Sequence, residues 1–229
     1  MNSAIIVAAG RGTRMGLPPS GMDKLFLEVA GRPVVAHTWQ RFADAAEIDE
    51  IVIVVRDGMQ PAFAELATRF NLRKPHGFVV GGAERQDSVA NGLAALSATA
   101  EIVAIQDGAR PCTSAALITA SIVAARETGA AVAAQAVTDT IKESADGQVI
   151  SRTVDRAKLW AVQTPQTFRV EIIRRALAEV RQRNLFITDD TAACELIGQP
   201  VRLVTDRAPN PKVTVPTDLP YVEQVLRGV

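Results

Sequence analysis

The chain has 229 residues, of which 48% are hydrophobic and 22% are charged, and its formal net charge is zero. This length fits one large α/β domain or one domain with an appendage, and the hydrophobic fraction suffices for a sizeable core. The charge balance gives no electrostatic reason to expect a protein that binds nucleic acid or a membrane surface.

Cysteine and histidine are too few and too scattered to predict a disulfide framework or a metal site. Cys112 and Cys194 lie far apart and match no metal-ligand spacing, so we expect both to be small core residues in a reducing compartment. His37 and His76 are likewise isolated. No signal-peptide pattern is found, and no apolar run approaches the roughly 18 residues of a membrane span. These features predict a cytoplasmic protein.

Short apolar runs alternate along the chain with longer helical patterns. The runs that predict strands are Ala4–Val7, Ile51–Val55, Phe78–Val80, Ile102–Ile105 and Ala131–Val137. They are apolar throughout, which indicates burial on both faces of a largely parallel sheet. Between them, helices are predicted from Pro33, from Asp87 or Ser88, and after Ser114. This alternation predicts an α/β fold with a doubly wound, mostly parallel sheet.

Residues 138–156, with the sequence TDTIKESADGQVISRTVDR, depart from this rhythm. Polar and apolar residues alternate around Asp146–Gly147, a pair typical of a tight turn, which predicts a β-hairpin. The segment has little apolar surface of its own, so we expect it to project as a dimerisation arm or as a solvated surface hairpin. The elements predicted beyond it are helices over Val170–Arg183 and Asp189–Ile197, a strand over Val201–Val204 and a helix from Asp218. We therefore expect one domain over residues 1–229, with a β-arm at about 138–156.

The first predicted strand leads directly into the glycine-rich segment Gly10–Gly16, GRGTRMG. It is not a Walker A loop, because no Gly-Lys-Ser/Thr ends it, and its third glycine comes one residue late for the dinucleotide fingerprint. The acid expected at the end of the second strand is also missing, and Arg11, Arg14 and then Lys24 follow instead. A glycine-lined turn beside fixed cations suits a triphosphate, although a solvated surface turn is the alternative.

The turns after the third and fourth predicted strands carry further candidates. The amides of Gly81 and Gly82 and the hydroxyl of Ser88 could contact a nucleotide, or Ser88 could simply cap the following helix. Asp107 ends the next strand, where it is well placed to hold a divalent cation, although a strand-ending Asp is also a common turn former. Arg110, three residues on, could hold a substrate phosphate.

Eight ordered segments closely resemble the motifs of the 2-C-methyl-D-erythritol 4-phosphate cytidylyltransferases. They are AAGRGTRMG with Lys24, GGAERQDSV, QDGARP, TDTIK, TVDR, QTPQTF, ITDD and NPKVT. The resemblance implies a Rossmann-like nucleotidyltransferase domain of the nucleotide-diphospho-sugar transferase type, and a homodimer with interlocking β-arms. It also implies transfer of CMP from CTP to 2-C-methyl-D-erythritol 4-phosphate, with Mg²⁺, in the non-mevalonate isoprenoid pathway. The products would be 4-diphosphocytidyl-2-C-methyl-D-erythritol and pyrophosphate.

The same resemblance implies a role for each matching site residue. The implied CTP-binding residues are Ala8, Ala9, Gly10, Gly12, Gly82 and Ser88. The implied catalytic residues are Arg14, Lys24 and Lys212. Asp107 would sit at the metal and the ribose. The remaining residues implied to bind substrate are Arg110, Thr164 and Thr188, with Thr140 and Arg156 lent by the partner's arm.

Three positions depart from the family pattern, and they bear on nucleotide selectivity more than on phosphate handling. Ala83 follows the double glycine where an acid is frequent, Asp23 replaces a proline before Lys24, and Pro209 replaces an acid before Lys212.

Four alternatives to this activity differ in what they would bind. A ribitol 5-phosphate cytidylyltransferase shares the fold and most motifs, whereas a pterin-cofactor nucleotidyltransferase shares only the first loop. An NAD(P)-dependent oxidoreductase is disfavoured by the late third glycine and the missing acid. A non-catalytic nucleotide-binding dimeric scaffold is disfavoured by the presence of Lys24, Lys212 and Asp107.

Overall fold

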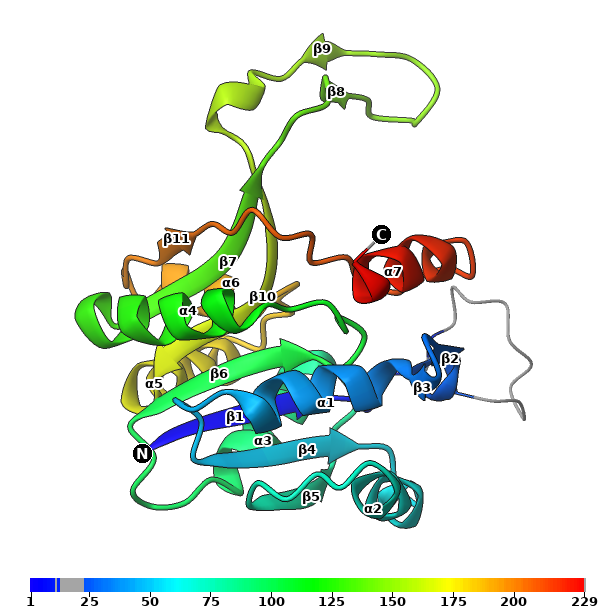
Figure 1. Ribbon diagram of the computed structural model, residues 1–229. Coiled ribbons are helices and arrows are strands. Elements are labelled where there is room, and N and C mark those ends of the chain that lie inside the picture. Colours follow the sequence, from blue (N-terminus) through cyan, green and yellow to red (C-terminus); the bar gives the residue numbers. More distant parts are fainter. Residues whose placement is uncertain (11, 13–22, 229) are drawn as a thin grey trace.

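The computed structural model of the chain describes residues 1–10, 12 and 23–228. A seven-stranded sheet lies at its centre, in the order β11-β7-β10-β6-β1-β4-β5 (Figure 1). The strands are β1 (Asn2–Val7), β4 (Glu50–Val55), β5 (His76–Val80), β6 (Ile102–Asp107), β7 (Ala130–Ala136), β10 (Trp160–Arg169) and β11 (Arg202–Val204). Neighbouring strands run parallel, except that β10 runs antiparallel to both β6 and β7.

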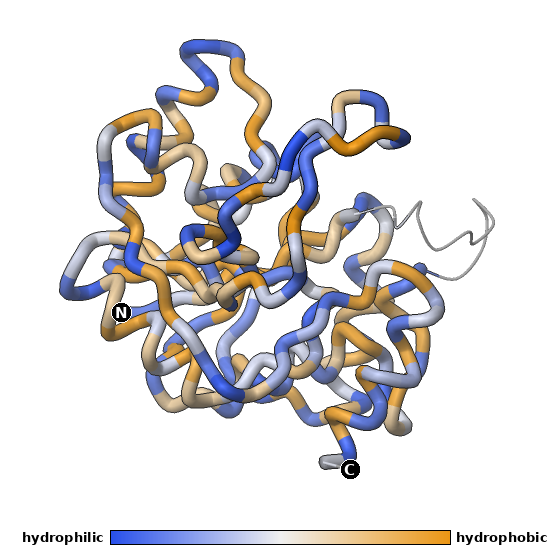
Figure 2. The backbone as a smooth tube through the Cα atoms, turned by 90° about the horizontal axis from the view of Figure 1, so that it is seen from above, coloured by the Kyte–Doolittle hydropathy of each residue, from blue (hydrophilic) through white to orange (hydrophobic). Residues whose placement is uncertain are grey.

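Helices cover both faces of the sheet, as the doubly wound prediction requires. One face packs against α1 (Val34–Asp44), α2 (Gln60–Arg69), α4 (Ala115–Thr128) and α7 (Asp218–Arg227). The other face packs against α3 (Arg85–Ala94), α5 (Val170–Gln182) and α6 (Asp190–Leu196). Hydrophobic stretches run through the body, and hydrophilic ones are interspersed along the surface loops (Figure 2). The burial of apolar side chains on both faces is the main stabilising term for such a sheet.

The two core layers contain the residues that the apolar patterns indicate. Trp39 and Phe42 of α1 are completely buried on one face, and Phe168 of β10 is completely buried on the other. Both cysteines are free and buried. Burial raises the pKa of the Cys112 thiol to about 11 and that of Cys194 to about 12. The two thiols are therefore protonated at neutral pH. Their place in the core is the one that the sequence predicts.

Local signals account for several of the helix boundaries. The Ser114 hydroxyl accepts a hydrogen bond from the Leu117 amide at 2.9 Å, which caps the start of α4 as expected. Gly129, with φ of 90°, ends the same helix in a left-handed conformation. The expected start of α3 at Asp87 or Ser88 is wrong, because Glu84 and Asp87 form a capping box that begins the helix at Arg85.

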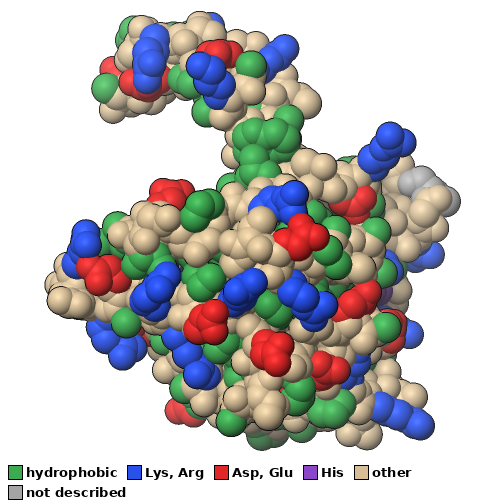
Figure 3. Space-filling model, turned by 90° about the vertical axis from the view of Figure 1, so that its left-hand side faces the viewer, with side chains coloured by type: hydrophobic (Ala, Val, Ile, Leu, Met, Phe, Trp, Pro, Cys, Tyr) green, Lys and Arg blue, Asp and Glu red, His purple; other side chains and the backbone are tan. Residues whose placement is uncertain are grey.

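Residues 138–156 form a projecting arm beyond β7 and β10 (Figures 1 and 3). The arm contains the short antiparallel pair β8 (Lys142–Glu143) and β9 (Arg152–Thr153), followed by the 3-10 helix η3 (Arg156–Lys158). The hairpin is shorter than the sequence predicts. The Asp146 carboxylate accepts from the amides of Gln148 and Val149, so Asp146–Gly147 lies inside a wider loop rather than at a two-residue turn.

The remaining elements lie between β1 and α1 in the chain. They are the 3-10 helix η2 (Lys24–Phe26) and the small hairpin of β2 (Glu28–Val29) and β3 (Arg32–Pro33). In the part of the chain that the structure describes, no helix has the length and apolar character needed to cross a membrane.

Candidate active site

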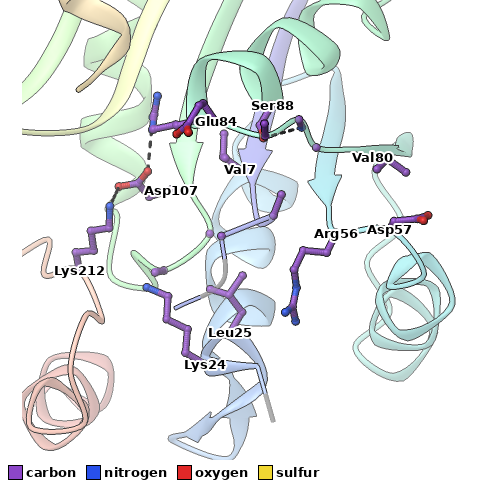
Figure 4. Close-up of a pocket in the computed structure, with 18 residues that line it drawn as sticks. Val7, Lys24, Leu25, Arg56, Asp57, Val80, Glu84, Ser88, Asp107 and Lys212 are labelled. Carbon is purple, nitrogen blue, oxygen red and sulfur yellow. Dashed lines mark hydrogen bonds and ion pairs between the residues drawn. The ribbon is translucent and has the colours of Figure 1, made fainter. Parts of the chain in front are cut away.

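A pocket of about 500 Å³ opens at the carboxyl ends of β1, β4, β5 and β6 (Figure 4). Because these four strands are parallel, the turns that follow them meet at one edge of the sheet, where ligands of open α/β folds bind. The pocket brings together seven of the residues implied by the resemblance, the last of them from the C-terminal segment: Ala9, Gly10, Lys24, Gly82, Ser88, Asp107 and Lys212.

One wall of the pocket is built from glycines that pack too closely for any side chain. A Cβ atom on Gly81 would lie 2.5 Å from the Ala9 Cβ and 2.8 Å from the Ser88 Oγ. A Cβ atom on Gly82 would lie 2.2 Å from the Asp87 Cβ. The Ser88 hydroxyl accepts a hydrogen bond from the Gly82 amide at 3.1 Å. Ser88 lies within α3 and is not its cap, so its hydroxyl shapes the turn that faces the pocket.

Lys24 enters the pocket from the first residue of η2. The Asp23 carboxylate caps this short helix by accepting from the Leu25 amide at 3.0 Å, and it also pairs with Arg56 at 2.6 Å. The Lys24 ammonium donates to the Val213 carbonyl at 3.1 Å, which links η2 to the C-terminal segment. A Cβ atom on Gly12, whose φ is 61°, would lie 3.0 Å from the Lys24 side chain. Asp23, where the family pattern has proline, therefore helps to hold Lys24 in place.

Asp107 lies at the tip of β6 among three cations. Its carboxylate is 2.7 Å from the Lys212 Nζ and 3.6 Å from both the Arg85 and Arg110 guanidiniums. Burial by itself raises the pKa of Asp107, but the positive charges of Lys212, Arg85 and Arg110 outweigh it and lower that pKa below its ordinary value. Asp107 is therefore an ionised carboxylate at neutral pH.

Arg85 connects this cluster to a second buried acid. It donates to the Asp190 carboxylate at 2.5 Å while its other nitrogen faces Asp107. The Asp190 side chain is fully buried, and its second oxygen has no hydrogen-bond partner among the described residues. Burial raises the pKa of Asp190, against the lowering effect of the Arg85 charge.

Arg110 and Thr164 lie beside Asp107 rather than among the residues that line the pocket. Arg110 donates to the Asn210 carbonyl at 2.7 Å, and the Thr164 hydroxyl accepts from the Asp107 amide at 3.1 Å. Both residues are mostly buried beside the Asp107 carboxylate.

Several of the implied site residues lie elsewhere. Ala8 is buried in one core layer, and Thr188 is exposed in the segment before α6. Thr140 and Arg156 lie on the exposed arm, where Arg156 donates to the Thr138 carbonyl. Arg14 lies outside the described residues.

The sequence prediction missed Arg56, Arg85, Asp190 and Asn210. Arg56 and Arg85 line the pocket, Asp190 pairs with Arg85, and Asn210 contacts Arg110 and Thr164. Arg85 lies in the segment GGAERQDSV together with Ser88, so the sequence itself indicates that the two residues are close. Its partner Asp190 is 105 residues away in sequence, and no local pattern connects the two.

The described residues contain no group of three His, Cys, Asp or Glu side chains that could hold a metal ion by themselves. Asp107 offers one carboxylate, and its Oδ2 is occupied by Lys212. The residues present fit Mg²⁺ if Asp107 supplies one carboxylate ligand and phosphate oxygens and water supply the others.

A model of the family described as 2-C-methyl-D-erythritol 4-phosphate cytidylyltransferase matches residues 2–228. The chain belongs to this family. An enzyme of that name from Pelotomaculum thermopropionicum is 41% identical over 227 residues, covering 99% of this chain and 94% of its own length. One from Geobacillus kaustophilus is 43% identical over 223 residues, covering 97% and 96%.

Solved structures agree with the sequence relatives. A crystal structure of the Thermus thermophilus 2-C-methyl-D-erythritol 4-phosphate cytidylyltransferase is 33% identical, with a TM-score of 0.79 over 97% of this chain and 98% of that one. The 4-diphosphocytidyl-2C-methyl-D-erythritol synthase from Anaerococcus prevotii is 29% identical, with a TM-score of 0.85 over 99% and 98%. The predicted family and fold class are confirmed. Among the alternatives, the family match favours methylerythritol phosphate over ribitol phosphate, and it classes the chain as a nucleotidyltransferase rather than a scaffold or an oxidoreductase.

Proposed function

We propose that the pocket at the carboxyl end of the sheet transfers CMP from CTP to 2-C-methyl-D-erythritol 4-phosphate, releasing pyrophosphate. The activity itself is that of the family to which the chain belongs. The observation that supports this location is the convergence of the Lys24 and Lys212 ammonium groups and the Asp107 carboxylate beside a glycine-lined wall.

In the proposed reaction, a phosphate oxygen of the methylerythritol phosphate attacks the α-phosphorus of CTP in line. A new phosphorus–oxygen bond forms while the bond between the α-phosphorus and the bridging oxygen breaks, and pyrophosphate leaves with the electron pair. The attacking phosphate is already ionised near neutral pH, so no protein nucleophile is required. Catalysis then consists of positioning the two substrates and neutralising their charge.

The residues divide between the two substrates. The Gly82 turn, Ser88 and Ala9 with Gly10 would receive the nucleoside, and Lys24 with Arg14 would neutralise the triphosphate. Gly12 would keep the Lys24 side chain in position. Lys212, Arg110, Thr164 and Thr188 would receive the polyol phosphate. Asp107 would hold Lys212 until that phosphate arrives and would face the ribose.

Mg²⁺ is the proposed cofactor, and Asp107 is the carboxylate that would contribute to holding it. When bound with the triphosphate, a divalent cation withdraws charge from the phosphoryl oxygens and the leaving group. Lys24 and Lys212 provide fixed positive charge in the same pocket.

We also propose that the arm is a dimerisation element and that the partner's Thr140 and the partner's Arg156 complete the polyol-phosphate side. The arm supports this because it projects from the body with exposed edges, and its tip leaves Val149 and Ile150 68% and 60% exposed. Short strands with open outer edges and exposed apolar residues are typical of surfaces that pair with another chain. Separately, we propose that the protein is located in the cytoplasm.

A pyrophosphate-release assay tests the function. Each of the four ribonucleoside triphosphates is paired with 2-C-methyl-D-erythritol 4-phosphate or ribitol 5-phosphate at several Mg²⁺ concentrations. We expect turnover with CTP and methylerythritol phosphate to exceed that of every other pair. Equal or faster turnover with ribitol 5-phosphate would overturn the substrate, and preference for another triphosphate would overturn the nucleotide, with Ala83 the first residue to examine.

A further inference from the structure

Asn210 is a buried amide that lies behind the candidate active site and ties three chain segments together. The residue is 3% exposed. Its side-chain Nδ2 donates to the Thr164 carbonyl at 2.8 Å and to the Gln163 Oε1 at 3.1 Å, both on β10. Its Oδ1 accepts from the Thr113 hydroxyl at 3.0 Å, in the turn after β6. The side chain is thus bonded on both its donor and its acceptor sides.

The backbone of Asn210 makes a fourth connection, because its carbonyl accepts from the Arg110 guanidinium at 2.7 Å. The segments that Asn210 joins are those that surround Asp107. The Thr164 hydroxyl accepts a hydrogen bond from the Asp107 amide. The Arg110 guanidinium lies 3.6 Å from the Asp107 carboxylate, and the ammonium of Lys212, two residues after Asn210, lies 2.7 Å from it.

The segment that carries Lys212 has a second anchor on the other side of that lysine. The Val213 amide donates to the Ala109 carbonyl at 2.9 Å, and Val213 is fully buried. Lys212 therefore lies between two fixed points, Asn210 and Val213. Lys24 donates to the Val213 carbonyl, so the position of Lys24 depends on the second anchor rather than on Asn210.

We propose that Asn210 is a positioning residue. It holds Lys212, Arg110 and Thr164 in their places around Asp107, and so organises the half of the active site that binds the polyol phosphate. The inference builds on the proposed function, in which these three residues receive the acceptor substrate. Asn210 itself touches neither substrate.

Asparagine suits this position because its side-chain amide has both an NH2 group that donates and an oxygen that accepts. A carboxylate in its place would keep the acceptor for Thr113 but would face the Thr164 carbonyl and the Gln163 oxygen with no hydrogen to donate. An apolar side chain would leave the buried Thr164 carbonyl and the Thr113 hydroxyl with one partner fewer. Second-layer groups of this kind typically alter activity by about 10- to 100-fold, because small displacements of the contacting residues slow the reaction.

The test compares Asn210→Asp and Asn210→Ala with the matched control Ser121→Ala. Ser121 is also fully buried and also bonds to β10, through the Thr167 hydroxyl at 3.0 Å, but it has no link to Asp107. We expect both Asn210 variants to lose about 10- to 100-fold in kcat/KM for the polyol phosphate, while the KM for CTP changes by less than about threefold. The control is expected to retain both values.

A second readout needs no turnover. Limited labelling with an amine-reactive ester, followed by peptide mass spectrometry, reports how firmly Lys212 is held. We expect Lys212 to react several-fold faster in Asn210→Ala than in the wild type and in Ser121→Ala. Lys74 serves as the internal reference, because its ammonium is held by the Ala45 and Ile48 carbonyls far from the site, and its labelling should not change.

These readouts separate the two proposals. Unchanged Lys212 labelling, or a rise in Lys74 labelling equal to that of Lys212, would overturn the positioning role of Asn210. A KM for CTP that rises as much as the KM for the polyol phosphate would also overturn it, since it indicates general loosening of the pocket. Absence of turnover by the wild type would overturn the proposed function, and the labelling result would still decide the role of Asn210.

Discussion

At the scale of single residues, both lysines of the pocket are held by acceptors of the protein itself. Lys212 bonds to the Asp107 carboxylate and Lys24 to the Val213 carbonyl, and both ammonium groups reach the same pocket. Charges that are positioned before the substrates arrive need little rearrangement during the reaction, so they contribute strongly to catalysis. The same arrangement links η2 directly to the C-terminal segment.

Removal of either lysine should therefore slow the chemical step. We expect Lys24→Ala and Lys212→Ala each to lower kcat by about 10²–10³-fold, because one fixed charge opposite the transferring phosphoryl group is lost. Steady-state kinetics with CTP and methylerythritol phosphate measure this effect.

A surface cation provides the control for that experiment. Arg202 on β11 pairs with Glu127 and is 52% exposed in its side chain, so Arg202→Ala should keep the wild-type kcat. A near-normal kcat in either lysine variant would contradict the assignment of that lysine.

His37 predicts a pH dependence of stability that is separate from the active site. Burial lowers the pKa of His37 below 6.5, and the charges of Arg32 and Arg41 lower it further, while its ring bonds to the Val29 carbonyl at 2.8 Å. The unfolded chain therefore binds this proton at a higher pH than the folded chain does. Stability should be fully present above about pH 6.5 and should fall as the pH drops through the lowered pKa of the folded state.

Thermal unfolding of His37→Gln measures that contribution. Glutamine can still donate to the Val29 carbonyl but does not titrate, so the variant should lose less stability than the wild type between about pH 7.5 and pH 5. Identical pH profiles for the two proteins would contradict the assignment to His37.

At the scale of elements, the turn between β5 and α3 depends on the absence of side chains. We expect Gly81→Ala to weaken CTP binding and to destabilise the fold by about 1–3 kcal/mol, because the new methyl would overlap Ala9 and Ser88. Titration calorimetry with CTP and thermal unfolding provide the two measurements.

Gly77 of β5 is the matched control, since a Cβ atom there would meet nothing within 4 Å. Gly77→Ala should leave CTP binding unchanged. If Gly81→Ala bound CTP as the wild type does, the proposal that this turn closely approaches the nucleotide would be wrong.

The sequence predicts the parallel part of the sheet well because most of its strands contain a continuous apolar run. It does not predict β10, which contains Pro165 and the polar residues Gln163 and Gln166, and whose pairing shifts register between Val162 and Gln166. That strand is stabilised by its position between β6 and β7, a tertiary effect that local pattern does not carry.

The sequence likewise predicts only part of the candidate site. Glycine spacing and strand ends indicate Gly82, Ser88 and Asp107, because the topology of parallel strands brings their ends together. The contacts of Arg85 with Asp190 and of Asn210 with Thr164 join residues 105 and 46 positions apart. Such pairs depend on how the layers pack, so they become visible only in the folded chain.

At the scale of the whole molecule, the proposed exchange of arms can be tested by mixing subunits. Arg156→Ala removes the arm's contribution, and Lys24→Ala removes the contribution of the pocket. If the arm serves the partner's pocket, a mixed dimer contains one intact site, and refolding equal amounts together should restore about a quarter of the wild-type activity.

The two variants alone set the baseline for that experiment. If the mixture were no more active than the average of the separate variants, although analytical ultracentrifugation showed dimers, the arm would act within its own chain or not at all.

The central claim is that this pocket joins CMP to methylerythritol phosphate through Lys24 and Lys212. Its most direct test is ³¹P NMR of the wild type and of the two lysine variants with CTP, Mg²⁺ and the polyol phosphate. The account predicts that the wild type forms a diphosphate diester and pyrophosphate in equal amounts, and that both variants do so far more slowly. Absence of the diester with the wild type, or its formation at the same rate in both variants, would contradict the account.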